Sequence, residues 1–213
     1  MKKGLKKIIL LLDKSQSMKK IQLETISGVN EFLSEQIESD NDIQFTLVTF
    51  NSYTNLVFQS VDIKSITPLS DRNYTPSGMT ALLDAIGTTI KDVGFRLSQM
   101  EEHERPEKVI FVIYTDGEEN CSSLYNYEEI NKMIKHQEEK YNWTFMFLAS
   151  NIDVNEYSNK LGINKDCVSS VDFDGDSSRL MYSSLSKSIS TGIKTGSYSI
   201  ENHITASGDN QNG

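Results

Sequence analysis

The hydrophobic residues of this chain alternate between continuous runs, typical of buried strands, and helical spacing. Five consecutive apolar residues at 8–12 (Ile-Ile-Leu-Leu-Leu) predict a strand buried on both faces. Further strands are expected at 108–114, at 143–149 and near 167–168. Apolar residues that recur every three or four positions predict amphipathic helices at about 19–39, 81–100, 126–141, 154–161 and 177–190.

A hairpin and a long loop complete the pattern. Residues 42–50 and 53–58 alternate apolar and polar side chains around Asn51-Ser52, which predicts a hairpin whose shorter strand lies antiparallel at the sheet edge. Residues 63–77 contain two of the three prolines and no sustained period, as expected of a loop. Strands alternating with helices predict an α/β fold with a doubly wound, mostly parallel sheet, helices on both faces and one antiparallel edge strand.

The length of 213 residues fits one domain with a substantial core. We expect this domain to span residues 1–192. Residues 193–213 are small, polar and weakly patterned, so we expect them to form a flexible carboxyl-terminal tail.

Charge and cysteine content narrow the function classes. With 21 basic and 30 acidic residues the net charge is −9, which disfavours binding to nucleic acids or anionic membranes. The apolar run at 8–12 is shorter than the roughly 7–15 residues of a signal-peptide core, and no segment approaches the roughly 18 apolar residues of a membrane span. Cys121 and Cys167 lie far apart, which indicates neither a disulfide framework nor a zinc site and favours a cytoplasmic location.

The first candidate for chemistry follows the strand at 8–12. Asp13, Ser15 and Ser17 fall in the loop at its carboxyl end, where ligands bind in open parallel sheets. A carboxylate and two hydroxyls are hard oxygen ligands of the kind that Mg²⁺ and Mn²⁺ prefer. The alternative is that Ser17 caps the helix expected from Lys19, and this motif alone leaves both interpretations open.

Two more polar positions fall at corresponding places. Thr80 follows Gly78 just before a predicted helix, and Asp116 follows the strand at 108–114. Each has a structural alternative, because Thr80 could cap a helix and Asp116-Gly117 could form a turn. Three loops that converge at one sheet edge are harder to assign to capping. We therefore predict a metal site formed by Asp13, Ser15, Ser17, Thr80 and Asp116.

These elements together resemble a known family. Asp13-Lys14-Ser15-Gln16-Ser17, Ser77-Gly78-Met79-Thr80-Ala81-Leu82 and Thr115-Asp116-Gly117 are similar to the Asp-x-Ser-x-Ser, Gly-x-Thr-Ala-Leu and Thr-Asp-Gly elements of von Willebrand factor A domains with a metal-ion-dependent adhesion site. The resemblance runs from about Lys6 to Ser190 and implies a Rossmann-like fold. Residues 143–153 and 161–163 resemble compact stand-alone members from bacteria and phages.

The resemblance also implies a function. Ser15, Ser17 and Thr80 would supply hydroxyl ligands to Mg²⁺ or Mn²⁺, and Asp13 and Asp116 would act directly or through water. The ion would then accept an Asp or Glu carboxylate from a partner protein. This implies a metal-dependent protein-binding module and no enzyme.

Two other functions compete with this one. A phage or bacterial assembly component could use the same site for a permanent subunit contact. A haloacid-dehalogenase-like Mg²⁺ phosphotransferase also places an Asp after its first strand, but it needs a second Asp two residues later, where this chain has Ser15. Glu118 and Glu119 could rim the metal site or form a solvated acidic turn.

Overall fold

The computed structural model describes residues 1–39, 41–150, 153–170 and 175–200, with side chains for all of these except 175–180. The strands of this part are β1 (Lys2–Asp13), β2 (Asp42–Phe50), β3 (Thr54–Asp62), β4 (Pro106–Thr115), β5 (Thr144–Ala149) and β6 (Val168–Ser170). Its α-helices are α1 (Gln22–Glu38), α2 (Leu82–Ser98), α3 (Tyr127–Tyr141), α4 (Val154–Leu161) and α5 (Gly175–Thr195). Short 3₁₀-helices span Gln16–Ile21, Ile63–Ser65, Glu102–Glu104 and Lys165–Cys167.

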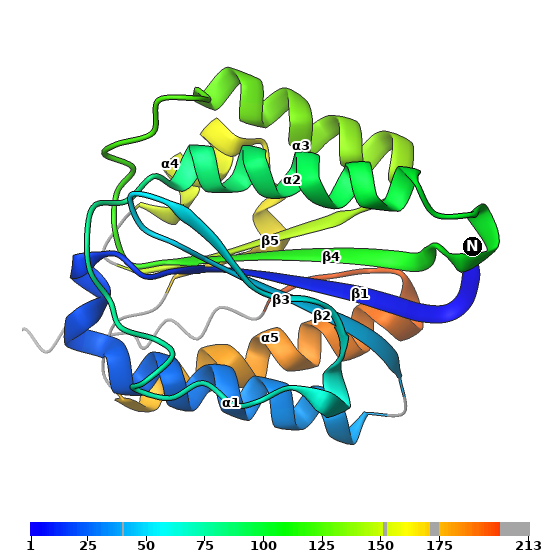
Figure 1. Cartoon of the computed structure of the whole chain (residues 1–213), viewed down its shortest axis with the longest axis horizontal. Coiled ribbons are helices and arrows are strands. Elements are labelled where there is room, and N and C mark those ends of the chain that lie inside the picture. Colours follow the sequence, from blue (N-terminus) through cyan, green and yellow to red (C-terminus); the bar gives the residue numbers. More distant parts are fainter. Residues whose placement is uncertain (40, 151–152, 171–174, 201–213) are drawn as a thin grey trace, which may run out of the picture.

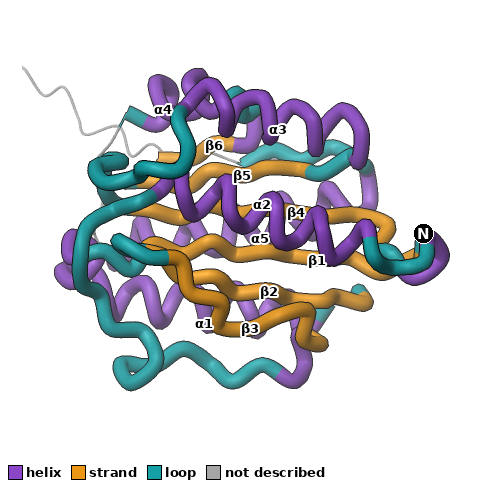
Figure 2. Tube along the Cα trace, turned by 45° about the horizontal axis from the view of Figure 1, so that its top comes forward, coloured by secondary structure: helices purple, strands orange, loops and turns teal. Residues whose placement is uncertain are grey.

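The strands form one sheet in the order β3-β2-β1-β4-β5-β6 (Figure 2). All neighbouring strands are parallel except β2 and β3, which form the predicted antiparallel hairpin at one edge. After β1 the chain adds β2 and β3 on one side and later adds β4, β5 and β6 on the other. The loops that leave β1 and β4 therefore diverge at their carboxyl ends, which is where open α/β sheets bind ligands.

Helices cover both faces of the sheet. Figure 1 shows α1 and α5 together on one face and α2, α3 and α4 on the other. The buried apolar run of β1 explains this layering, because a strand covered on both faces has no polar side to expose. The predicted doubly wound α/β fold is confirmed.

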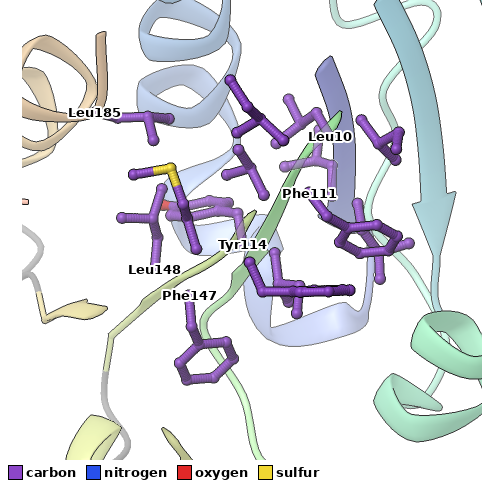
Figure 3. Close-up of a cluster of buried hydrophobic side chains, with 14 of the residues drawn as sticks. Leu10, Phe111, Tyr114, Phe147, Leu148 and Leu185 are labelled. Atoms are coloured by element: carbon purple, nitrogen blue, oxygen red, sulfur yellow. The ribbon is translucent and has the colours of Figure 1, made fainter. Parts of the chain in front are cut away.

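The core lies in two layers, one on each side of the sheet. Figure 3 shows one part of it, in which Tyr114 and Leu148 lie near Leu185 of α5 and Phe147 points away from that helix. The fit of α1 against α5 is close. A Cβ at Gly28 of α1 would lie 2.0 Å from a ring carbon of Tyr182, so only glycine lets the two helices approach this far.

The boundaries of several elements differ from the sequence predictions: β1 and β3 are longer than expected, and the first and last helices are shifted. The helix expected from Lys19 begins with the 3₁₀-helix Gln16–Ile21, and α1 itself starts at Gln22. The last helix, expected to end at Ser190, continues to Thr195, and Ile200 beyond it is buried with its N–H donating to Asp166 O at 2.7 Å. Residues 193–195 of the predicted tail thus belong to α5, Ile200 is buried against the domain, and 201–213 lie outside the described residues.

The edge strand β3 is irregular. Its register against β2 shifts between Phe45 and Leu47 and again between Leu47 and Val48. At the first shift Ser60 has a φ of 50°, an unusual value for a residue other than glycine. The bulge turns the Ser60 side chain toward Lys7 of β1, whose ammonium donates a hydrogen bond to it.

Among the described residues, no helix is long and apolar enough to cross a bilayer. Both cysteines are free thiols, with Cys167 buried and Cys121 partly exposed.

Candidate metal centre

The loops after β1 and before α2 are held together by main-chain hydrogen bonds at the carboxyl edge of the sheet. Gln16 N donates to Gly78 O at 2.9 Å, and Ser77 N donates to Lys14 O at 2.8 Å. The β2–β3 turn joins them, because Ala81 N donates to Asn51 O at 2.9 Å. Gly78 adopts a φ of +83°, which suits glycine at this tight approach.

Asp13 lies at the base of this cluster and is fully buried. Its Oδ1 accepts a hydrogen bond from Ser15 N at 2.7 Å, and its Oδ2 accepts one from Thr115 Oγ1 at 2.6 Å. The phenol of Tyr74 donates to the Asp13 carbonyl at 2.6 Å. Strand β4 and the 63–77 loop therefore fix both the carboxylate and the main chain of this residue.

Ser15, Ser17 and Asp116 form a chain of oxygens beside it. Ser15 Oγ lies 2.9 Å from Ser17 Oγ, and Ser17 Oγ donates to Asp116 Oδ1 at 2.5 Å. The other carboxylate oxygen, Asp116 Oδ2, is buried and has no hydrogen-bond partner. The Lys20 ammonium lies 3.9 Å from it, a weak ion pair without a hydrogen bond. A buried carboxylate oxygen with no donor is costly to keep charged.

Thr80 reaches the same cluster from the loop before α2. A Cβ placed on Gly117 would lie 3.1 Å from Ser17 Oγ and 3.6 Å from Thr80 Oγ1, so both hydroxyls stand beside this glycine. The Thr80 main chain is held in place by Asn120, whose Oδ1 accepts from Thr80 N at 2.9 Å and whose N donates to Thr80 O at 3.0 Å. The structure thus brings together all five residues predicted from the sequence.

The electrostatics of the cluster favour a cation. Burial raises the pKa of Asp13 to about 6, against the opposing effect of the hydrogen bonds from Thr115 and Ser15. Burial also raises the pKa of Asp116, which the Ser17 hydrogen bond and the Lys20 charge lower only in part. Both carboxylates would be stabilised in the ionised form by a positive charge placed between them.

The capping alternatives do not hold for either loop. Ser15 stands at the start of the 3₁₀-helix without a side-chain capping bond, and Ser17 lies inside that helix and bonds to Asp116. The N-cap of α2 is Ala81, so Thr80 does not occupy the capping position. The hydroxyls of this cluster are therefore not used to start helices.

Glu119 has a structural role that the sequence did not reveal. Its Oε2 accepts from Leu83 N at 3.0 Å and from Ser122 Oγ at 2.7 Å, and its Oε1 accepts from Cys121 N and Ser122 N at 2.9 and 2.7 Å. This carboxylate ties the loop after Asp116 to the start of α2. Glu118 is exposed.

Thr115, Tyr74, Asn51 and Asn120 support the site but were not assigned a role from the sequence. Thr115 was noted only as the first residue of the Thr-Asp-Gly element, without a role of its own. Tyr74 lies in an aperiodic loop and no pattern marks it. Its fully buried phenol becomes interpretable only once the fold places it against β1.

The donor set is two carboxylates and three hydroxyls. No group of three or more His, Cys, Asp or Glu side chains suited to a metal occurs in the described part of the chain. A metal here would therefore depend on neutral hydroxyl oxygens, which suits hard divalent ions that keep several bound waters. The buried Asp116 Oδ2, which has no hydrogen-bond partner, fits such an ion.

Solved structures share this fold at low sequence identity. Proximal thread matrix protein 1 from the mussel byssus matches with a TM-score of 0.59 and 16% identity over 86% of this chain and 46% of that one. A form of the same protein with a zinc-occupied MIDAS motif matches with a TM-score of 0.56 and 17% identity, covering 93% of this chain and 47% of that one. A von Willebrand factor type A protein from Catenulispora acidiphila matches with a TM-score of 0.56 and 12% identity, covering 88% and 42%. This chain spans about half the length of these structures.

A search of curated proteins finds no match. The family model of the von Willebrand factor type A domain matches residues 7–182, which include the second half of β1, all of β2 to β6 and all five residues of the candidate metal centre. Domains of this family often bind metal through the MIDAS motif and generally mediate protein interactions. The chain belongs to the von Willebrand factor type A domain family.

Proposed function

We propose that this chain is a metal-dependent protein-binding module, in which Asp13, Ser15, Ser17, Thr80 and Asp116 hold Mg²⁺ or Mn²⁺. The observation that supports this most directly is the buried Asp116 Oδ2, which has no hydrogen-bond partner, while the other oxygen of the same carboxylate accepts from Ser17 Oγ. When bound, the ion would act as an electrophile toward a carboxylate from a partner protein.

The carboxylates and the hydroxyls of the metal centre have different roles in this proposal. Hydrogen bonds from Ser15 N and Thr115 Oγ1 fix the orientation of the Asp13 carboxylate. Ser15, Ser17 and Thr80 supply neutral oxygens, which leave the centre with too few negative charges to repel another carboxylate. This matters in a chain of net charge −9, which would otherwise disfavour an acidic partner.

Mn²⁺ binding tests the metal part of the proposal. Thr80→Val keeps the shape of the side chain and removes its hydroxyl, so we expect the Mn²⁺ affinity, followed by electron paramagnetic resonance of the free ion, to fall roughly tenfold or more. Thr89→Val is the matched control, because its buried hydroxyl has no hydrogen-bond partner and lies on α2 outside the centre. Equal Mn²⁺ affinity in wild type and Thr80→Val would refute the assignment.

The carboxylate part needs a separate measurement. Water bound to Mn²⁺ relaxes bulk water protons, so acetate titrated into the Mn²⁺ complex should lower this relaxation by replacing a bound water. Acetamide serves as the uncharged control. If saturating acetate does not change the relaxation rate, the bound metal does not accept a carboxylate, and this part of the proposal is refuted.

Assembly and enzyme functions remain the alternatives. If the centre serves a permanent subunit contact, the mass measured by sedimentation should rise with Mg²⁺ and fall with chelator. Phosphotransfer is the weaker alternative, because the position two residues after Asp13 is a serine whose hydroxyl lies against Ser17. Mg²⁺-dependent hydrolysis of an aryl phosphate that Asp13→Asn abolishes would favour it over the binding module.

A further inference from the structure

A groove lies away from the metal centre, between the carboxyl-terminal half of α2 and the β3 side of the sheet. This groove has a volume of about 240 Å³, and none of the five residues of the metal centre lines it. Its apolar wall is formed by Val48, Leu56, Val93, Leu97 and Met100. Its polar lining includes Lys7, Ser60, Thr89 and Arg96.

Lys7 is the unusual member of this lining. It stands on the central strand β1, is only 4% exposed, and donates a hydrogen bond to Ser60 Oγ. Among the described residues Lys7 forms no ion pair, whereas the adjacent Lys6 pairs with Glu107 at 2.8 Å. Burial, and secondly the charge of Arg96, lowers the pKa of Lys7 to about 8, so its amine is still mostly protonated at pH 7.

Arg96 is already neutralised at the mouth of the groove. Its Nε donates to Asp92 Oδ2 at 2.9 Å, and the side chains of this pair are 47% and 44% exposed. With its amide oxygen turned toward the guanidinium, Gln59 accepts from Arg96 Nη1 at 2.6 Å. The groove therefore carries one uncompensated positive charge, which belongs to Lys7.

The lining of the groove also includes a residue whose hydroxyl has no hydrogen-bond partner. Thr89 Oγ1 lies in its lining, is buried, and has no hydrogen-bond partner. Thr89 is 4% exposed, so bulk water does not satisfy this hydroxyl well. Almost none of this oxygen's surface is accessible, so a ligand would reach it only after a shift of the groove wall. The buried Lys7 ammonium, which has no counter-charge, is the group that favours an acceptor.

We propose that this groove binds a small organic monocarboxylate, with its carboxylate on Lys7 and its apolar part along Val93 and Leu97. A monoanion fits better than a phosphate dianion, because only Lys7 lacks a counter-charge and the Asp92 carboxylate at the mouth would repel a second negative charge. The volume of about 240 Å³ lies below the roughly 300–1,000 Å³ of clefts that take drug-sized ligands, which suits a small molecule. This site is independent of the metal centre and of the function proposed for it.

Octanoate is the probe for this site. Octanoate is titrated into the ¹⁵N-labelled protein in the presence of a chelator, at concentrations below those at which it forms micelles. We expect saturable changes in the amide NMR chemical shifts of residues 56–60 and 88–100. The amide analogue octanamide has the same chain without the charge and should bind roughly tenfold more weakly or not at all. Inorganic phosphate should not saturate the site.

Lys7→Met tests the residue itself. Methionine keeps an unbranched apolar side chain, one atom shorter, and removes the buried charge, so the variant should fold, and octanoate affinity should fall roughly 10- to 100-fold. Lys135→Met, at an exposed position of α3, is the matched control and should bind octanoate as the wild type does. No saturable shift with wild type, unchanged affinity in folded Lys7→Met, or equal binding of octanamide would each overturn the proposal. Because the assay contains chelator, none of these results depends on the metal centre.

Discussion

Replacing Asp13 by Asn should make the metal-free protein more stable while abolishing its response to metal. Asn has the shape of the protonated carboxyl, and its Oδ1 can still accept from Ser15 N. Thr115 Oγ1 would turn from donor to acceptor toward the new amide, since Gly117 O lies 3.2 Å away as another acceptor for its proton. The substitution thus removes a buried charge without removing a contact.

The magnitude follows from the pKa of Asp13, which burial raises from 3.8 to about 6. Between these two pH values the folded protein keeps a proton that the unfolded chain has lost, so stability falls as pH rises through this window. A shift of about 2 units corresponds to roughly 3 kcal/mol at pH 7. Only about 0.5 kcal/mol of this cost is present at pH 4, and it vanishes below the unfolded pKa. For a domain of this size that is a difference of roughly 6–12 °C in Tm.

Thermal unfolding of both proteins in chelator at pH 4, 5, 6 and 7 measures this difference. We expect Asp13→Asn and wild type to unfold at similar temperatures at pH 4 and to diverge as the pH rises, with the variant higher. Added Mg²⁺ at a hundredfold excess over its dissociation constant should then raise wild-type stability by about 2.7 kcal/mol and leave the variant unchanged. A wild type that is more stable than the variant at pH 7 in chelator would show that the hydrogen bonds to the carboxylate outweigh the cost of burying its charge.

Three further variants test other parts of the structure. Lys20→Gln removes the ammonium that stands in the metal centre, so Mn²⁺ affinity should rise two- to fivefold in the same resonance assay, and a weaker affinity would contradict this. Glu119→Ala removes the acceptor of four hydrogen bonds and should lower the urea-unfolding free energy by roughly 2–3 kcal/mol, where a loss under 0.5 kcal/mol would be too small for this role. Gly28→Ala should destabilise by roughly 3 kcal/mol or more because its Cβ overlaps the Tyr182 ring, whereas Gly94→Ala, with only one atom at 4.0 Å, should stabilise by about 0.5–1 kcal/mol.

The elements and the five oxygen-bearing residues could be predicted because each depends on local sequence. The run before Asp13 is apolar enough to define a buried strand, and the topology then places Asp13 and Asp116 at one edge. The supporting contacts could not be predicted in this way. Tyr74 and Glu119 act through hydrogen bonds to residues 61 and 36 positions away, and such contacts leave no periodic signal in their own segments.

The end of the last helix was placed too early for a related reason. Residues 193–200 have a mostly small and polar composition, which is typical of tails, yet Tyr198 packs on Gly192 and Ile200 bonds to the segment before β6. Composition reports average hydrophobicity and does not show that single apolar side chains such as Tyr198 and Ile200 contact the domain. The location of the chain in the cytoplasm and its bacterial or phage origin stay predictions.

The irregular register of β3 also bears on how the domain behaves at high concentration. A straight, regular edge strand offers a neighbouring molecule a continuous row of donors and acceptors and so invites sheet-to-sheet association. The two register shifts in β3 break this row, and the left-handed Ser60 bends the strand within it. At the opposite edge, the described part of β6 has three residues. Pairing of sheets between crowded copies of the domain through β3 is therefore disfavoured.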